Sequence, residues 1–149
     1  MTETSSTPDI SALVVPMDVW TRPFWDAAAE GELKLVRCGA CRRYRWPPGP
    51  FCPYCQSQAT EWTAAGPARV YSFTVVRDRG GEGQPLRVQV PALVEFPEAE
   101  GVRIVAAIVD APVDRIEIGS PLELAWSPAE NARIPVFRLA PGGSRPSGG

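Results

Sequence analysis

The chain of 149 residues contains no histidine. Without an imidazole it cannot form a Ser-His or Cys-His nucleophilic pair or use a histidine general base. Phosphate-binding loops of the G-x-G-x-x-G and G-x-x-x-x-G-K-[ST] types are also absent. The run Gly80-Gly81-Glu82-Gly83 is rich in glycine, but it joins two expected strands with no helix after it, so we interpret it as a mobile loop. These absences disfavour an enzyme that acts alone.

Long apolar runs, a secretory signal and an excess of basic charge are lacking as well. No stretch approaches the roughly 18 consecutive apolar residues that a membrane-spanning helix needs. Met1–Val15 has neither a basic start nor a sufficient apolar run for a signal peptide. We therefore expect a cytoplasmic protein with reduced cysteines. The formal net charge is −2, which argues against nucleic acid as a partner, because nucleic-acid-binding domains usually carry a basic excess.

The four cysteines stand in two tight pairs, Cys38-Gly39-Ala40-Cys41 and Cys52-Pro53-Tyr54-Cys55, and no cysteine is left over. In each C-x-x-C pair two sulfurs leave one tight turn, a zinc knuckle, and two facing knuckles complete a tetrahedral shell around one ion. The short link between the pairs suits a small rubredoxin-like ribbon. We predict a structural Zn²⁺ site with no open position for catalysis. Its ligands are Cys38, Cys41, Cys52 and Cys55.

Other uses of the cysteines fit less well. Two structural disulfides would need an oxidising compartment, which the missing signal sequence argues against. A thioredoxin-like redox pair belongs to a βαβ unit, and the sequence contains no such unit. A rubredoxin-type iron site uses the same four sulfurs, so iron stays open as the alternative to zinc.

The sequence divides into two modules between two flexible ends. We predict a flexible N-terminal arm over residues 1–18, a helix and zinc ribbon over 19–65, an OB-fold domain over 66–140 and a flexible tail over 141–149. The helix is expected between a capping Thr21 and Gly31. The barrel is expected from five runs of β-branched and aromatic residues, with a short helical or turn connector between the third and fourth. These runs are 69–77, 91–96, 102–110, 121–126 and 134–139. The predicted fold class is therefore mainly β.

Two groups of aromatic residues are candidate binding features. One group alternates cationic and aromatic side chains, in the run Arg42-Arg43-Tyr44-Arg45-Trp46. This pattern suits the binding of a phosphate-bearing ligand or nucleic acid. It is equally typical of a solvated tip of the ribbon. Phe24 and Trp25 are adjacent on the expected helix, so their side chains point about 100° apart. One of them can pack on the protein while the other faces a partner. We therefore predict that Phe24 and Trp25 bind a partner.

Taken in order, these motifs resemble a known family of zinc-ribbon and OB-fold proteins, long catalogued as a domain of unknown function. The resemblance covers about residues 21–140. It rests on Phe24-Trp25-Asp26, Leu35, Cys38, Cys41, Pro47-Pro48, Cys52-Pro53, Cys55, Tyr71-Ser72-Phe73-Thr74, Ile118-Gly119 and Val136-Phe137.

The resemblance implies a non-catalytic accessory subunit. Members of this family form complexes with thiolase-like enzymes, among them thiolases, aldolases and acyltransferases of lipid, steroid and polyketide metabolism. The partner supplies the catalytic residues, and the ribbon-and-barrel chain helps it handle acyl-CoA thioesters. A nucleic-acid-binding module is the alternative, because zinc ribbons and OB-folds often bind nucleic acid. The acidic balance of the chain favours the accessory subunit.

Overall fold

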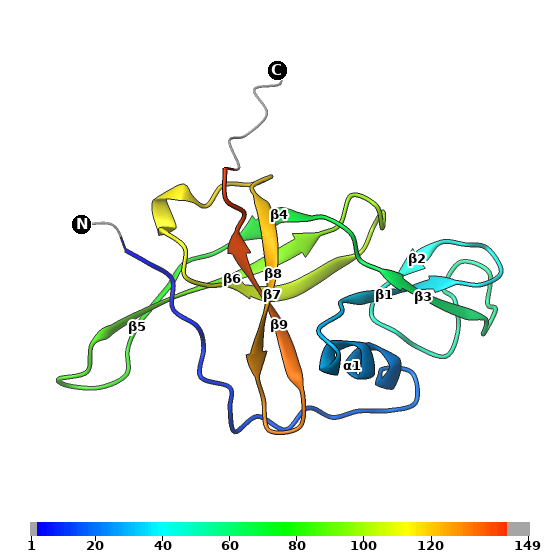
Figure 1. The fold of residues 1–149 in the computed structure, drawn as a ribbon, viewed down its shortest axis with the longest axis horizontal. Helices are drawn as coiled ribbons and strands as arrows, with labels where there is room; N and C mark the ends of the chain where they lie inside the picture. The colour runs from blue at the N-terminus through cyan, green and yellow to red at the C-terminus, as the bar shows by residue number, and fades with distance from the viewer. Residues whose placement is uncertain (1–2, 143–149) are drawn as a thin grey trace, which may run out of the picture.

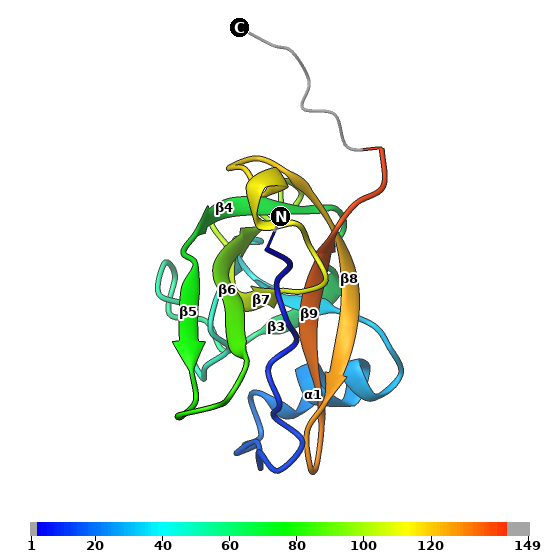
Figure 2. The same ribbon diagram turned by 90° about the vertical axis from the view of Figure 1, so that its left-hand side faces the viewer.

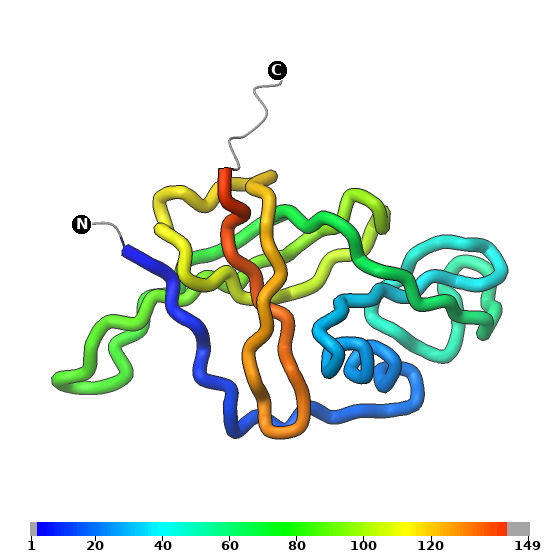
Figure 3. Tube along the Cα trace, viewed as in Figure 1, coloured from blue at the N-terminus to red at the C-terminus, as the bar shows by residue number. Residues whose placement is uncertain are grey.

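The computed structural model describes residues 3–142. A small three-stranded sheet with one helix lies beside a larger β-barrel (Figure 1). The N-terminal segment runs past the barrel before it reaches the helix, as the Cα trace shows (Figure 3). The mainly β fold class that the sequence predicts is confirmed.

Helix α1 (Arg22–Ala29) is short and buries one face. The Asp18 carboxylate accepts hydrogen bonds from the backbone N–H groups of Trp20 (3.0 Å) and Thr21 (2.8 Å), whereas the Thr21 side chain makes no capping bond. Asp18 therefore organises the turn before the helix. The helix ends at Ala29, and two residues later Gly31 has a φ of 78°, in the left-handed region that favours glycine. Its buried face consists of Phe24, Ala27 and Ala28.

The small sheet contains strands β1 (Lys34–Cys38), β2 (Tyr44–Arg45) and β3 (Thr60–Ala64), in the order β2-β1-β3. Both pairings are antiparallel, and Val36 lies opposite Arg45 on one side and Trp62 on the other. Because directly opposite residues point to the same face, these three side chains share one face of the sheet. The first cysteine pair begins at the last residue of β1, and the second lies in the loop between β2 and β3.

The barrel is closed by five strands: β4 (Ala68–Phe73), β6 (Leu86–Glu95), β7 (Arg103–Ile108), β8 (Pro121–Pro128) and β9 (Arg133–Leu139). β4 pairs with both β6 and β8, and a parallel contact between Ile108 and Phe137 joins β7 to β9, which completes the ring. This is the five-stranded OB-fold expected from the sequence. The predicted connector contains a 3₁₀ helix, η1 (Val113–Arg115).

Alternate residues of the barrel strands fill its interior. In β6 buried and less buried residues alternate from Val88 to Glu95, as in a strand with one face on the core. Val70, Val90, Val94, Ile108 and Phe137 are at most 1% exposed. Burying each such side chain contributes about 1.5–3 kcal/mol to folding.

An additional strand differs from the prediction. The run predicted over 69–77 is split, because β4 ends at Phe73 and a separate strand β5 (Val76–Arg79) follows. β5 pairs with residues 86–89 of β6 and forms a hairpin that extends beyond the barrel (Figure 1). All four β5 residues are exposed. β5 is thus held by main-chain pairing with β6 alone, and the glycine-rich run 80–83 lies in the loop between these two strands.

The described part of the predicted N-terminal arm is a strap on the barrel, over residues 3–15. Ser5 is only 2% exposed, and its backbone N–H donates to the Ala111 carbonyl at 2.8 Å. The Ser6 N–H donates to the Val88 carbonyl of β6 at 2.8 Å. The strap therefore fills the gap between β6 and the chain that leaves β7, and Figure 2 shows it passing between β6 and β9.

The other end of the strap is held by the turn between β8 and β9. The Asn131 side chain accepts from the Val15 N–H at 2.8 Å and donates to the Val15 carbonyl at 2.9 Å. The composition of residues 1–18 predicts a flexible arm, whereas these bonds hold the end of the described segment on the barrel. They join positions more than a hundred residues apart, so no local pattern reveals them. Of the tail predicted over 141–149, residues 143–149 lie outside the described residues.

We predict that Asn131→Ala lowers the free energy of unfolding by about 1–2 kcal/mol, because it leaves both backbone groups of the buried Val15 without partners. Denaturant titration measures this change. Ser11→Ala is the matched control, since the Ser11 hydroxyl bonds only Asp9 in an exposed turn and its loss should cost less than about 0.5 kcal/mol. Equal costs for the two variants would contradict the assigned role of the strap.

Candidate metal centre

The four cysteine sulfurs gather at one point between the two predicted knuckles. All four Sγ atoms lie within 4.8 Å of one another. The Sγ atoms of Cys38 and Cys55 are 3.6 Å apart, as are those of Cys41 and Cys52. In a tetrahedral site with Zn–S bonds of about 2.3 Å, neighbouring sulfurs lie about 3.8 Å apart. The cysteines are therefore positioned to bind one metal ion with four thiolates, as the sequence predicts.

The two knuckles have the same backbone geometry. The N–H of the residue after each pair, Arg42 and Gln56, donates to the carbonyl of the first cysteine at 3.0 and 2.9 Å. Both residues have a positive φ, 68° and 66°, which is uncommon outside glycine. The N–H groups of Cys38 and Cys52 in turn donate to the carbonyls of Arg43 and Ser57. This repeated turn directs both sulfurs of each pair to the same side.

The sulfurs cannot all be charged without a cation. Hydrogen bonds from the Cys41 and Ala40 N–H groups outweigh burial and lower the pKa of Cys38 to about 6. At Cys41 the Arg43 N–H acts in the same direction, but burial and the neighbouring thiols together raise its pKa to about 11. Because a metal ligand must be a thiolate, a divalent ion at the centre would remove this conflict. The donor set thus fits zinc.

The ribbon shields the centre unevenly. Cys38 and Cys52 are fully buried, whereas Cys55 is exposed. Glu61 of β3 receives ion pairs from Arg37 of β1 (2.7 Å) and from Arg42 of the first knuckle (3.0 Å). The hydrogen bond from Arg37 lowers the pKa of Glu61. This carboxylate therefore fixes the first knuckle to the sheet.

The predicted partner-binding residues lie where the helix meets the ribbon. Phe24 is 5% exposed and belongs to the core, while Trp25 is only partly buried. Their rings meet edge to face with centroids 4.8 Å apart, and Phe24 also contacts Trp46 at 5.2 Å. In this structure the Phe24 side chain is therefore a packing residue, and Trp25 is the member of the pair that keeps exposed surface.

The cation-aromatic segment Arg42–Trp46 does not act as one unit. Arg42 pairs with Glu61, and the Arg43 guanidinium lies 4.8 Å from the centre of the Tyr54 ring. The Tyr44 hydroxyl contacts Thr63 at 3.1 Å. Arg45, by contrast, is buried, and none of its three guanidinium nitrogens has a hydrogen-bond partner. Sequence reasoning missed this burial, because only the pairing of β1 with β2 shows that Arg45 shares a covered face with Val36.

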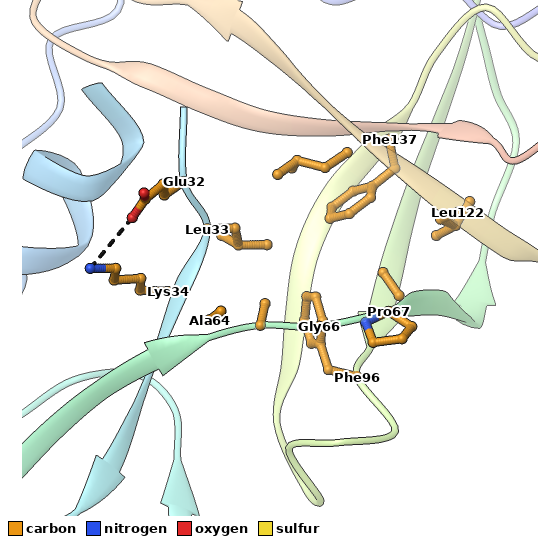
Figure 4. A pocket seen from close by; sticks show the side chains of 12 residues that line it. Glu32, Leu33, Lys34, Ala64, Gly66, Pro67, Phe96, Leu122 and Phe137 are labelled. Atoms are coloured by element: carbon orange, nitrogen blue, oxygen red, sulfur yellow. Dashed lines mark ion pairs between the residues drawn. The ribbon is translucent and has the colours of Figure 1, made fainter. Parts of the chain in front are cut away.

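An apolar cleft of about 420 Å³ lies where the ribbon meets the barrel (Figure 4). Leu33 and Ala65 line it on the ribbon side, and Phe96 and Phe137 line it on the barrel side. The ion pair between Lys34 and Glu32, with 3.4 Å between nitrogen and oxygen, stands at one side of it. The cleft can accept an apolar group, but it contains no nucleophile paired with a base.

Two knuckles followed by a closed barrel define a protein with a zinc ribbon and an OB-fold. Comparison with known families agrees. The ChsH2 rubredoxin-like zinc ribbon domain matches residues 25–61, and the ChsH2 C-terminal OB-fold domain matches residues 62–127. A "DUF35 domain-containing scaffold protein" of Methanothermobacter thermautotrophicus is 30% identical over 92 residues, which are 60% of this chain and 68% of that protein. The chain belongs to the ChsH2 (DUF35) family, and the resemblance found in the sequence is confirmed.

Other similar proteins carry different names. A "Probable enoyl-CoA hydratase alpha subunit" of Thermomonospora curvata is 41% identical over 122 residues, or 78% of this chain, but the match spans only 37% of that protein. A chain of the solved "Ltp2-ChsH2(DUF35) aldolase" is 34% identical, with a TM-score of 0.72 over 85% of this chain and 98% of that one. A DUF35 protein of Sulfolobus solfataricus shares the fold at 16% identity, with a TM-score of 0.59 over 80% of this chain and 84% of that one.

No helix within residues 3–142 has the length and apolar character needed to cross a bilayer.

We predict that the purified protein holds about one zinc per chain and that Cys52→Ser loses it and lowers the melting temperature, because metal binding to a closed site contributes folding free energy. Elemental analysis and thermal melts measure both effects. Ser57→Ala is the control in the same loop, since its hydroxyl accepts a bond only from the nearby Ala59 N–H and its backbone carbonyl is kept. Absence of zinc and iron, with unchanged melting of Cys52→Ser, would refute the assignment.

Proposed function

We propose that this chain is a non-catalytic accessory subunit. It binds a thiolase-like enzyme (a thiolase, an aldolase or an acyltransferase) and helps that enzyme handle acyl-CoA thioesters in lipid, steroid or polyketide metabolism. The partner supplies the catalytic residues. This chain supplies a metal-stabilised ribbon, a barrel and the surfaces between them.

The observation that carries the proposal is the similarity to a chain of the Ltp2-ChsH2(DUF35) aldolase, which extends over 98% of that chain. The scaffold protein of Methanothermobacter thermautotrophicus points in the same direction through its name. The relative named as a hydratase subunit is longer, so its activity belongs to a protein of which this chain matches only a part.

The chemistry of the described residues supports a role without catalysis. The chain has no histidine. Its four cysteine sulfurs lie within 4.8 Å of one another, and a four-thiolate metal site leaves no position for water or substrate. The apolar cleft between ribbon and barrel supports the acyl part of the proposal, because it offers a sheltered apolar surface of the kind that binds hydrocarbon groups.

The structure weighs against the nucleic-acid alternative. OB-folds bind oligonucleotides across their second and third strands, between the loop after the first strand and the loop before the last. Here those strands are β6 and β7, and the strap already spans the two loops. Glu3 pairs with Arg77 of β5 at 2.7 Å, and Leu13 accepts from the Glu130 N–H at 2.9 Å. A single strand would have to displace the chain's own backbone from this groove.

We expect no turnover of acyl-CoA thioesters by the purified chain, with activity appearing when the thiolase-like partner is added. Steady-state assays with each chain alone and with both together measure this. Hydrolysis, condensation or aldol cleavage by this chain in isolation, abolished by a point substitution within it, would overturn the proposal. Tight binding of a fluorescent oligonucleotide at physiological salt would favour the alternative.

We place the partner contact at the start of α1. Trp25→Ala should weaken association with the partner by roughly thirtyfold, as expected for a central aromatic worth about 2 kcal/mol. Phe24→Ala should mainly lower this chain's own stability, because the side chain is buried. Pull-down and thermal melts separate the two effects. Tyr71→Ala, on an exposed barrel position, is the control; loss of binding with Tyr71→Ala alone would place the interface on the barrel.

A further inference from the structure

Arg45 is the only charged residue buried in the described part of the chain. It is 5% exposed, and its Nε, Nη1 and Nη2 atoms have no hydrogen-bond partner there. A guanidinium stays protonated at any ordinary pH, so it cannot escape burial by losing its charge. Burying a charge without a counter-charge is strongly destabilising. Something other than the hydrogen bonds within this chain must therefore compensate it.

The carboxylate of the ribbon sheet does not do so. Glu61 lies opposite Arg37 in the register of β1 and β3, and it receives the ion pairs of both Arg37 and Arg42. Arg45 lies opposite Val36, one position away from Arg37, and therefore on the other face of the sheet. The ion-pair network and the Arg45 side chain are separated by the sheet itself.

The face that carries Arg45 also carries Cys38. Val36 and Cys38 are two residues apart on β1, so their side chains point the same way. Arg45, opposite Val36, is thus the diagonal neighbour of Cys38 across the strand pair. Diagonal neighbours lie about 7–8 Å apart, which is within reach of a long side chain. Arginine is among the longest side chains available.

We propose that the Arg45 guanidinium is the counter-charge of the metal-thiolate centre. Four thiolates around one divalent ion leave two negative charges uncancelled, and Cys38 and Cys52 are fully buried. The low dielectric of the ribbon interior, which makes an unpaired guanidinium costly, also strengthens its attraction to this centre. Arg45 is not a ligand. It acts on the ion through the charge of the sulfurs.

A small void offers the competing explanation. A cavity of about 70 Å³ lies on the same face and is lined by Val36, Pro48 and Trp62 among others, although Arg45 itself does not line it. A water or a small anion that reached Arg45 from this cavity would satisfy the guanidinium without the metal. The two explanations predict different responses to metal removal.

The test measures zinc affinity by competition with a chromophoric chelator, on the full chain without partner. Arg45→Met should weaken zinc binding about tenfold to a hundredfold, the usual effect of losing a group that supports metal ligands. Arg45→Lys keeps the charge and should retain most of the affinity. Arg43→Met is the matched control. Arg43 is directly opposite Cys38 and therefore on the same face of the sheet as Arg45, but it is exposed. Because solvent screens the charge of Arg43, its loss should change the zinc affinity little.

Thermal melts of the loaded and metal-stripped forms provide an independent reading. In the stripped form Arg45→Met should be more stable than the original chain, because an unpaired buried charge has been removed. This gain should shrink or reverse once zinc is bound. The proposal would be overturned if Arg45→Met left the zinc affinity unchanged and stabilised the loaded and stripped forms equally. The guanidinium would then be compensated by a water or anion from the cavity.

If Arg45→Met folds poorly, the absorption spectrum of the cobalt-substituted protein tests the proposal instead. A nearby positive charge stabilises the thiolate electrons, so the thiolate-to-cobalt charge-transfer band should move to longer wavelength when the charge is removed. Arg45→Gln should show this shift, whereas Arg45→Lys and Arg43→Met should not. An identical band in all four proteins, the original chain included, would contradict a charge acting on the sulfurs.

Discussion

The crowding of four sulfur atoms within 4.8 Å is the constraint on which the small module depends. Four thiolates at this separation repel one another strongly unless a cation lies between them, and the conflict shows in the opposite pKa shifts of Cys38 and Cys41. The surrounding sheet has three short strands, one of only two residues, and can bury little apolar surface by itself. Metal-thiolate bonds therefore contribute the folding free energy that a core of this size does not.

The ribbon is joined to the barrel by a continuous apolar core. Phe24 of the helix, Leu33 and Leu35 of the ribbon side and Phe96 and Phe137 of the barrel all belong to one buried cluster, with Trp25 and Trp46 packed against it. The two modules therefore share packing, although they are separate sheets. The cleft in Figure 4 lies within this junction, with lining residues from both the ribbon and the barrel.

Two sites that often give such modules a function of their own are already used within this chain. The metal centre is closed by thiolates, and the groove of the OB-fold is spanned by the strap. Apolar surface is available elsewhere, at the junction between the modules and at exposed side chains such as Val19 before α1 (75%) and Val105 on β7 (73%). This distribution suits a protein that supports the chemistry of another chain better than one that performs chemistry itself.

Local sequence determined the parts that depend on short spacing. The two C-x-x-C pairs predict the knuckles, and the β-branched runs predict the barrel strands, because both signals come from residues a few positions apart. Only the tertiary structure decided the strap, the extra strand β5, the burial of Phe24 and the isolation of Arg45. Each of these depends on contacts between distant segments, as with Asn131 and Val15, or on which face of a sheet is covered. A residue pattern states which side chains could be buried, whereas the packing of one module on another determines which of them are.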